Sequence, residues 1–152
     1  MRLVAAGAAE ADVLAQAHAL GFEHPWPAKD IVTLFEGPGV FGFLVIEAER
    51  AVGMILCRTV LEDAEVLTVA VDPAVRGRGV GRALVEASTA AAAAAGATAM
   101  FLEVAVDNAP ALALYARAGF HRAGLRSAYY DRGDAGRVDA IAMRLDLPAA
   151  RS

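Results

Sequence analysis

The sequence predicts an α/β fold, and two observations support that prediction. Apolar runs of strand length and β-branched character alternate along the chain with segments whose apolar residues recur at helical spacing. Residues 65–88 contain a predicted strand, a glycine-rich turn and a predicted helix in direct succession. A chain of 152 residues is long enough to bury a sizeable core, and we expect residues 1–152 to form one domain.

The first part of the chain is expected to mix short helices with strands. Apolar residues between Val13 and Leu20 recur at helical spacing, and Gly21 is a natural end for that helix. Two prolines in residues 22–27 prevent the helix from continuing. The predicted elements are a strand at 2–6, helices at 10–20 and 28–35, and strands at 40–47 and 51–61, the last interrupted at Gly53.

The rest of the chain continues the alternation. Pro73 ends the strand at 65–71 because proline has no N–H for the ladder. Asp107 or Asn108 can cap a later helix that ends at Gly119, with Pro110 tolerated in its first turn. The predicted elements are a helix at about 78–95, a strand at 99–106, a helix from 108 to 119, strands at 120–127 and 137–145, and a frayed tail at 148–152.

The glycine-rich turn, residues 76–81, is a candidate phosphate site. Missing side chains let an anion approach the backbone N–H groups, and the positive end of the helix dipole points at it. A P-loop is excluded because no Gly-Lys-Ser/Thr follows, and the dinucleotide pattern fails because Arg82 stands where a third glycine is needed. The alternative is a turn whose glycines serve only geometry.

Three arginines, Arg76, Arg78 and Arg82, crowd this turn. Cations at the start of a helix are electrostatically unfavourable unless an anion is present. We therefore expect at least one of them to contact phosphate, the alternative being that all three face solvent.

Glu103 and Tyr115 are the candidate acid–base residues. A carboxylate among apolar strand neighbours costs free energy unless it has a partner or an exposed end, so Glu103 suggests a general base. The alternative is that its face of the strand meets solvent. Tyr115 lies two helical turns after Asn108 and shares its face, although a core tyrosine is the simpler interpretation.

Composition and charge exclude several classes of function. The net charge of −4 does not favour a nucleic-acid binder, and no segment is long and apolar enough to span a membrane. Cys57, the single cysteine, is expected to be a buried apolar residue. His18, His24 and His121 show no metal-ligand spacing and are each expected at the surface or at a cap. We expect a cytoplasmic protein without a metal.

Two motifs resemble the GCN5-related N-acetyltransferase (GNAT) family. Residues 76–81 match its Arg-x-x-Gly-x-Gly pyrophosphate loop behind a similar strand, and residues 108–120 match its Asn-x-x-Ala-x-x-Leu-Tyr-x-x-x-Gly-Phe signature. The resemblance implies a mixed, mostly antiparallel sheet of about seven strands, splayed at an acetyl-CoA site, with helices on both faces.

The same resemblance implies roles for individual residues. Glu103 is implied as the base that deprotonates an amine, and Tyr115 as the acid that protonates the departing thiolate. A backbone N–H near Val69 is implied to stabilise the oxyanion. Acetyl-CoA would contact the following residues: Val69, Ala70, Val71, Arg76, Gly77, Arg78, Gly79, Val80, Gly81, Arg82 and Asn108.

Further segments resemble the bacterial RimI branch of this family, namely residues 24–27, 102–104, 126–130 and 139–143. That branch acetylates the N-terminal alanine of a small-subunit ribosomal protein, so Trp26, Tyr129 and Tyr130 are implied to contact the acceptor peptide. Pro27 and Ala128 depart from its usual Ser and Asn, which leaves the exact acceptor open. We expect a monomer or weak dimer.

Two other functions remain open from the sequence. One is an acetyltransferase for a small amine or a lysine side chain, against which the segment with Tyr129 and Tyr130 argues. The other is a non-catalytic acyl-CoA-binding sensor, against which Glu103 and Tyr115 argue.

Overall fold

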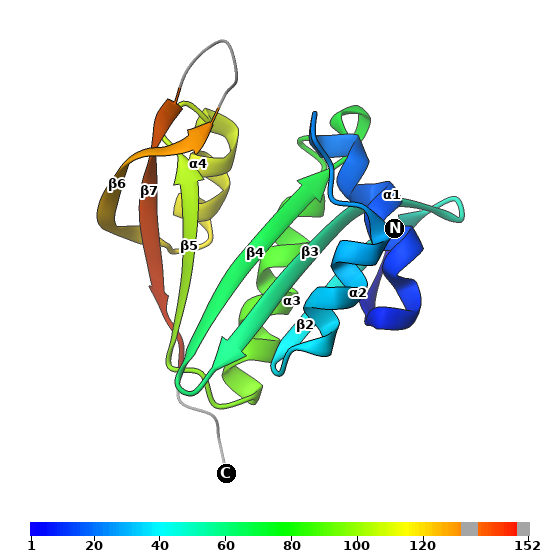
Figure 1. Ribbon diagram of the computed structural model, residues 1–152, viewed down its shortest axis with the longest axis horizontal. Helices are drawn as coiled ribbons and strands as arrows, with labels where there is room; N and C mark the ends of the chain where they lie inside the picture. Colours follow the sequence, from blue (N-terminus) through cyan, green and yellow to red (C-terminus); the bar gives the residue numbers. More distant parts are fainter. Residues whose placement is uncertain (132–136, 149–152) are drawn as a thin grey trace.

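The computed structural model describes residues 1–131 and 137–148, with the backbone alone for 125–131 and 137. Its strands form one seven-stranded sheet in the order β1-β2-β3-β4-β5-β7-β6 (Figure 1). Neighbouring strands are antiparallel except β4 and β5, so the mixed, mostly antiparallel sheet is confirmed. The strands are β1 (Arg2–Ala6), β2 (Val40–Glu47), β3 (Arg50–Val60), β4 (Asp63–Val71), β5 (Ala99–Ala105), β6 (His121–Asp131) and β7 (Arg137–Asp146).

Helices cover both faces of the sheet. Helices α3 and α4 pack against one face of the sheet, which we call the α3 side. Helices α1 and α2 pack against the other face, which we call the α1 side. The helices are α1 (Ala11–Gly21), α2 (Ala28–Glu36), α3 (Val80–Ala94) and α4 (Ala109–Arg117), with short 3₁₀ turns η1 (Ala8–Glu10) and η2 (Pro73–Val75).

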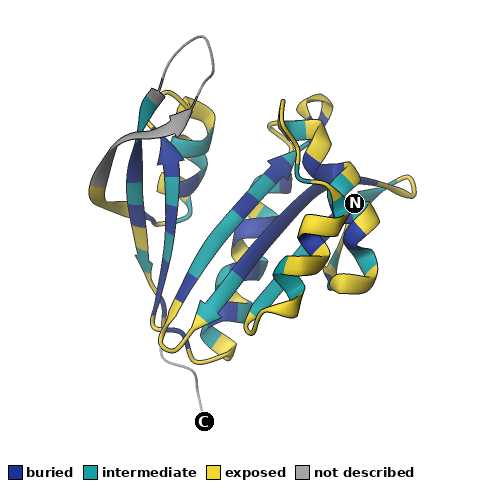
Figure 2. Ribbon diagram, viewed as in Figure 1, coloured by how far each residue is buried: buried dark blue, intermediate teal, exposed yellow. Residues whose placement is uncertain are grey.

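Strand β3 lies at the centre of the molecule. Its residues from Val52 to Cys57, apart from Gly53, are apolar and buried on both faces of the sheet, because helices pack on each side (Figure 2). An extra residue, Val52, lies between the pairs Val45–Gly53 and Ile46–Ala51. The interruption expected at Gly53 is therefore a β-bulge at the adjacent residue, and the strand continues through it.

The sheet opens between β4 and β5. The two parallel strands pair only over residues 63–65 and 99–101, and beyond that point they are not paired with each other. Strand β5 pairs instead with β7 along its whole length, from Ala99 to Ala105. In Figure 1 the two groups of strands diverge toward the carboxyl ends of β4 and β5. The predicted splay is confirmed.

A second β-bulge lies in β4. Leu56 of β3 faces Thr68, whereas the next residue, Cys57, faces Val66, which leaves Leu67 as the extra residue. In a regular strand, every second side chain lies on the same face of the sheet. One inserted residue shifts this alternation, so the residues after it lie on the face opposite to the one expected.

The bulge decides which β4 side chains face each helix layer. Val66, Val69 and Val71 all pack with the core on the α3 side. Ala70 packs with the core on the α1 side, and Thr68 contacts α1 through a hydrogen bond to His18. In a regular strand of the same sequence, Val69 and Val71 would lie on the opposite face from Val66.

Three local expectations are revised or supported by the structure. Helix α3 begins at Val80 rather than near residue 78, because Gly79 adopts a left-handed φ of 84° that a continuing helix cannot contain. Cys57 is buried as expected, and burial raises the pKa of its thiol to about 12. The expectation that His18 is a surface or capping residue is wrong, since its side chain is only 1% exposed.

Candidate active site

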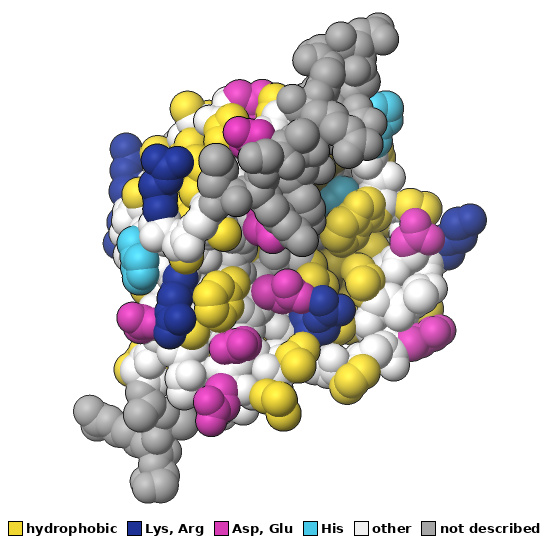
Figure 3. All heavy atoms as spheres, turned by 60° about the vertical axis from the view of Figure 1, so that its left-hand side comes forward, with side chains coloured by type: hydrophobic (Ala, Val, Ile, Leu, Met, Phe, Trp, Pro, Cys, Tyr) yellow, Lys and Arg dark blue, Asp and Glu magenta, His cyan; other side chains and the backbone are white. Residues whose placement is uncertain are grey.

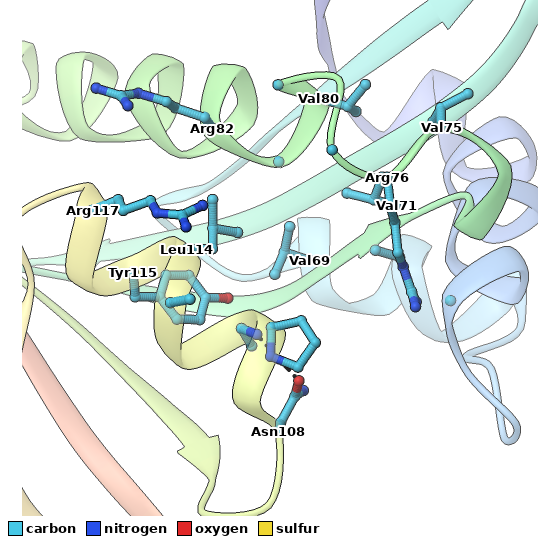
Figure 4. Close-up of a pocket in the computed structure, with 18 of the residues that line it drawn as sticks. Val69, Val71, Val75, Arg76, Val80, Arg82, Asn108, Leu114, Tyr115 and Arg117 are labelled. Carbon is cyan, nitrogen blue, oxygen red and sulfur yellow. Dashed lines mark hydrogen bonds between the residues drawn. The ribbon is translucent and has the colours of Figure 1, made fainter.

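A pocket of about 530 Å³ lies where the sheet opens, between the carboxyl end of β4 and helix α4 (Figure 4). The glycine-rich turn and the start of α3 form another of its walls. The lining residues are Gly21, Phe22, Val69, Ala70, Val71, Val75, Arg76, Gly77, Gly79, Val80, Gly81, Arg82, Asn108, Pro110, Ala111, Ala113, Leu114, Tyr115 and Arg117. Most of the residues that the sequence predicted for a cofactor are thus brought together.

The glycine-rich turn presents backbone rather than side chains to this pocket. Gly77 and Gly79 have φ angles of 82° and 84°, and a Cβ atom at either position would meet nothing within 4 Å. The first N–H of α3 to bond within the helix is that of Ala83, which donates to the Gly79 carbonyl. The preceding N–H groups have no partner within the helix, which suits a phosphate group.

Helix α4 approaches the start of α3 very closely at one point. A Cβ atom on Gly81 would lie 3.0 Å from Cδ2 of Leu114, so a larger residue there would force the leucine side chain to shift. The two helices therefore define the width of the pocket between the glycine-rich turn and α4.

The pocket is positively charged. Arg76, Arg82 and Arg117 line it, and the described lining residues include no carboxylate. In Figure 4 the side chain of Arg76 extends from the turn past the end of β4. Arg82 also donates from Nε to Glu86 one turn later, at 2.8 Å. This charge suits a phosphorylated ligand.

Arg78 is placed differently from the other arginines of the turn. It is not among the pocket-lining residues, and its Nη1 and Nη2 donate to the carboxylate of Glu47 on β2, at 3.2 and 2.8 Å. The hydrogen bond from Arg78 lowers the pKa of Glu47. The sequence treated Arg78 as a cofactor contact, whereas the structure ties it to the β2–β3 hairpin.

A second ion pair joins the same hairpin to the base of the turn. Asp72 accepts from the backbone N–H of Ala74 at 2.9 Å and from Nη1 of Arg50 at 2.8 Å. These two hydrogen bonds, the backbone one first, lower the pKa of Asp72. The hairpin and the glycine-rich turn are therefore held together at two points.

Helix α4 brings Tyr115 and Asn108 to the pocket. Tyr115 is 4% exposed, and its ring packs edge-on against Phe120 with centroids 5.8 Å apart. Its hydroxyl is directed across the gap toward Val69 of β4 (Figure 4). The Oδ1 atom of Asn108 accepts from the Ala111 N–H at 3.2 Å, so this residue caps the helix as one of the two predicted possibilities.

Glu103 lies on the other side of the sheet from Tyr115. Its neighbours Leu102 and Val104 are buried on the α3 side, so the Glu103 side chain, at the alternate position of β5, is half-buried on the α1 side. It is not among the residues that line the 530 Å³ pocket. The candidate base and the candidate acid therefore approach the opening from opposite faces.

The residues predicted for the acceptor are placed in part. Trp26 lies in the loop between α1 and α2, partly buried against the core on the α1 side, and does not line the pocket. Tyr129 and Tyr130 belong to β6, but their side chains lie outside the described residues. Their predicted contacts with an acceptor remain predictions.

The sequence predictions left out eight of the residues that line the pocket, namely Gly21, Phe22, Val75, Pro110, Ala111, Ala113, Leu114 and Arg117. Arg117 lies two turns after Pro110 and one turn after Ala113, so helical spacing from the motif could have revealed it. Phe22 directly follows α1 and carries no signal of its own in the sequence. Its position depends on how the loop packs.

Three observations on the described part of the chain concern the binding of nucleic acids, membranes and metals. On the face shown in Figure 3, acidic and basic side chains are interspersed. No helix among the described residues has the length and apolarity needed to cross a membrane. In that same part of the chain, no cluster of three potential metal ligands is present.

Similarity to known proteins agrees with this geometry. The chain is 34% identical over 123 residues to the ribosomal protein bS18-alanine N-acetyltransferase of Escherichia coli K12, covering 81% of this chain and 82% of that protein. It is 45% identical over 91 residues to the N-alpha-acetyltransferase RimI of Mycobacterium tuberculosis, covering 60% of this chain and 54% of that protein.

Solved structures show the same fold. The crystal structure of the Escherichia coli ribosomal-protein-S18-alanine N-acetyltransferase has a TM-score of 0.88 and 28% identity, with 99% of this chain and 96% of that chain covered. Arabidopsis thaliana NAA60 in complex with acetyl-CoA has a TM-score of 0.79 at 17% identity, covering 95% and 97%, which shows the fold alone. The sequence profile of the Acetyltransferase (GNAT) family matches residues 11–120, and the chain belongs to that family.

Proposed function

We propose that this protein transfers the acetyl group of acetyl-CoA to the N-terminal α-amine of a protein, namely the N-terminal alanine of a small-subunit ribosomal protein. The observation that carries the proposal is the positively charged pocket at the sheet opening, with Tyr115 on one side and Glu103 on the other face. The similarity to enzymes named for alanine acetylation of bS18 supports the choice of acceptor.

The phosphate groups of acetyl-CoA are assigned to the glycine-rich turn. Backbone N–H groups at the start of α3 would bind the pyrophosphate, with Arg76 and Arg82 neutralising its charge. Arg78 would act indirectly, by holding the turn to Glu47. The pantetheine arm would run between β4 and α4, past Asn108, and bring the thioester to Tyr115.

The chemistry then needs one base and one acid. An α-amino group has a pKa of about 8 and must lose a proton before it can attack the thioester carbonyl. Glu103 would take that proton, directly or through a water molecule, from the α1 side of the sheet. Attack forms the C–N bond, an N–H of β4 near Val69 stabilises the oxyanion, and the C–S bond breaks as Tyr115 protonates the sulfur.

The test is acetyl transfer to a peptide that begins with alanine, compared with the same peptide carrying a blocked N-terminus. Thiol release and a mass increase of one acetyl group are expected only with the free peptide. Glu103→Gln is expected to lower kcat by about 10²- to 10⁴-fold while acetyl-CoA still binds, because the general base is lost.

Small amines and a peptide with an internal lysine serve as competing acceptors. Faster transfer to either of these than to the alanine peptide would contradict the proposed acceptor. Binding of acetyl-CoA without turnover on any amine would contradict the enzymatic function itself.

A further inference from the structure

His18 is enclosed by two aromatic rings from the loop that follows its helix. The imidazole stacks on Phe22, with ring centroids 4.2 Å apart and planes 7° from parallel. On the other side it stacks on Trp26, at 5.0 Å and 23°. The imidazole is only 1% exposed. We call Phe22, His18 and Trp26 the aromatic stack.

Both ring nitrogens of His18 take part in hydrogen bonds. The backbone N–H of Trp26 donates to Nδ1 at 3.1 Å, and Nε2 lies 3.1 Å from the hydroxyl oxygen of Thr68. A backbone N–H can only donate, so Nδ1 has to accept and the proton has to be on Nε2. His18 is therefore neutral, and Nε2–H donates to Thr68.

These contacts connect two parts of the site that are distant in sequence. Thr68 follows the bulge of β4 and precedes Val69, which lines the pocket. Phe22 lines the same pocket, and Trp26 continues the loop toward α2. The stack lies on the α1 side of the sheet, which is also the side of Glu103. An amine that reaches Glu103 has to approach on this side.

We propose that His18 is a positioning residue for the acceptor: it fixes the loop of Phe22 and Trp26 against the bulged segment of β4, and so forms one wall of the acceptor path. The proposal rests on the proposed acetyl transfer to an amine. Acetyl-CoA would use the pocket, which Phe22 borders and Trp26 does not, so the hydrogen bond from Trp26 to His18 should matter more for the acceptor than for the cofactor.

Only some side chains can replace His18 in this role. The residue has to accept a hydrogen bond from the Trp26 N–H close to its own backbone and donate a hydrogen bond to Thr68 further out. In His18→Asn the amide oxygen stands at the place of Nδ1, so the bond from Trp26 can be kept and the bond to Thr68 is lost. In His18→Gln the amide stands at the place of Nε2, so the reverse holds.

The experiment measures KM for the alanine-starting peptide and for acetyl-CoA separately, together with kcat, in these two variants. We expect His18→Gln to raise KM for the peptide by about five- to tenfold, because the loop loses its anchor at Trp26. KM for acetyl-CoA should change by less than about twofold. His18→Asn loses the bond to Thr68 but keeps the anchor at Trp26, so it should raise KM for the peptide by less than His18→Gln does.

The single tryptophan gives a second readout that needs no turnover. Release of the loop in His18→Gln should shift the fluorescence emission of Trp26 to longer wavelength, and His18→Asn, which keeps the hydrogen bond from Trp26, should shift it less. Leu14→Val is the matched control, because it loosens the buried face of the same helix and keeps all three side chains of the aromatic stack.

The possible outcomes separate this inference from the proposed function. An unchanged KM for the peptide in His18→Gln overturns the positioning role while the enzymatic function stands. An equal increase of this KM in Leu14→Val, at the same loss of thermal stability, has the same consequence. Equal increases in both KM values also overturn it. A wild-type protein that acetylates no amine overturns the proposed function, and the inference with it.

Discussion

Arg78 and Glu47 form an ion pair that links the glycine-rich turn to strand β2, with Nη2 2.8 Å from Oε1. The neighbouring Arg76 instead lines the pocket. Two arginines of the same turn therefore differ in their contacts: Arg76 lines the pocket, and Arg78 forms an ion pair with β2.

Arg76→Ala should therefore weaken acetyl-CoA binding more than Arg78→Ala. Losing a charge-assisted hydrogen bond to phosphate costs about 1.5–3 kcal/mol, which corresponds to an increase in KM of about ten- to a hundredfold. Arg78→Ala should raise KM by less than about threefold, because an exposed ion pair contributes little. Steady-state kinetics at low and high salt measure both, and similar effects in the two variants would contradict this division of tasks.

The left-handed glycines of α3 offer a matched pair of substitutions. Gly79 and Gly96 have φ angles of 84° and 98°, and a Cβ atom at either position meets nothing within 4 Å. Alanine at either site should cost about 1–2 kcal/mol of stability from backbone strain. Only Gly79→Ala should also raise KM for acetyl-CoA, because its Cβ would stand in the phosphate site. Thermal unfolding and kinetics of both variants separate strain from ligand contact.

Tyr115→Phe should separate packing from acid catalysis. The ring contact with Phe120 remains, so thermal stability should change little, while kcat should fall by about 10²- to 10⁴-fold if the hydroxyl protonates the thiolate. KM for acetyl-CoA should stay close to that of the wild type. An unchanged kcat, measured by thiol release, would assign Tyr115 to the core alone.

His18 should make the protein less stable in mild acid. Burial lowers the pKa of His18 from 6.5 to about 4, so between these pH values the unfolded chain binds a proton that the folded protein does not. The free energy of unfolding should therefore decrease as pH falls through this range, by at most about 1.4 kcal/mol per pH unit.

Urea unfolding at about pH 7 and about pH 5 measures this effect, with His18→Asn as the control that cannot titrate. The difference between the two proteins isolates His18 from the carboxylates Glu47 and Asp72, whose lowered pKa values also reduce stability in acid. A difference that does not vary with pH would show that His18 has an ordinary pKa in the folded protein.

Cys57 should not react with thiol reagents in the folded protein. Burial raises the pKa of the thiol to about 12 and removes it from solvent, so neither thiolate nor access is available. Because it is the only cysteine, the rate of alkylation should follow global unfolding and increase with denaturant. Rapid labelling under native conditions would instead indicate local opening of β3.

The sequence by itself determined the order of the elements and the position of the glycine-rich turn. Local patterns suffice for both, since helical spacing, strand runs and the glycines of residues 76–81 act over a few neighbouring residues. The sequence likewise predicted a helix capped by Asp107 or Asn108, and in the structure Asn108 is the cap and Tyr115 lines the pocket.

Only the tertiary structure decided which side chains meet. The bulge at Leu67 reverses the faces of β4, a single-residue effect that no periodicity reveals. It turns Thr68 toward His18, a residue fifty positions earlier that sequence reasoning placed at the surface. The pairing of Arg78 with Glu47 and the entry of Arg117 into the pocket also depend on long-range packing. Contacts of this kind arise from how elements dock, which no local pattern encodes.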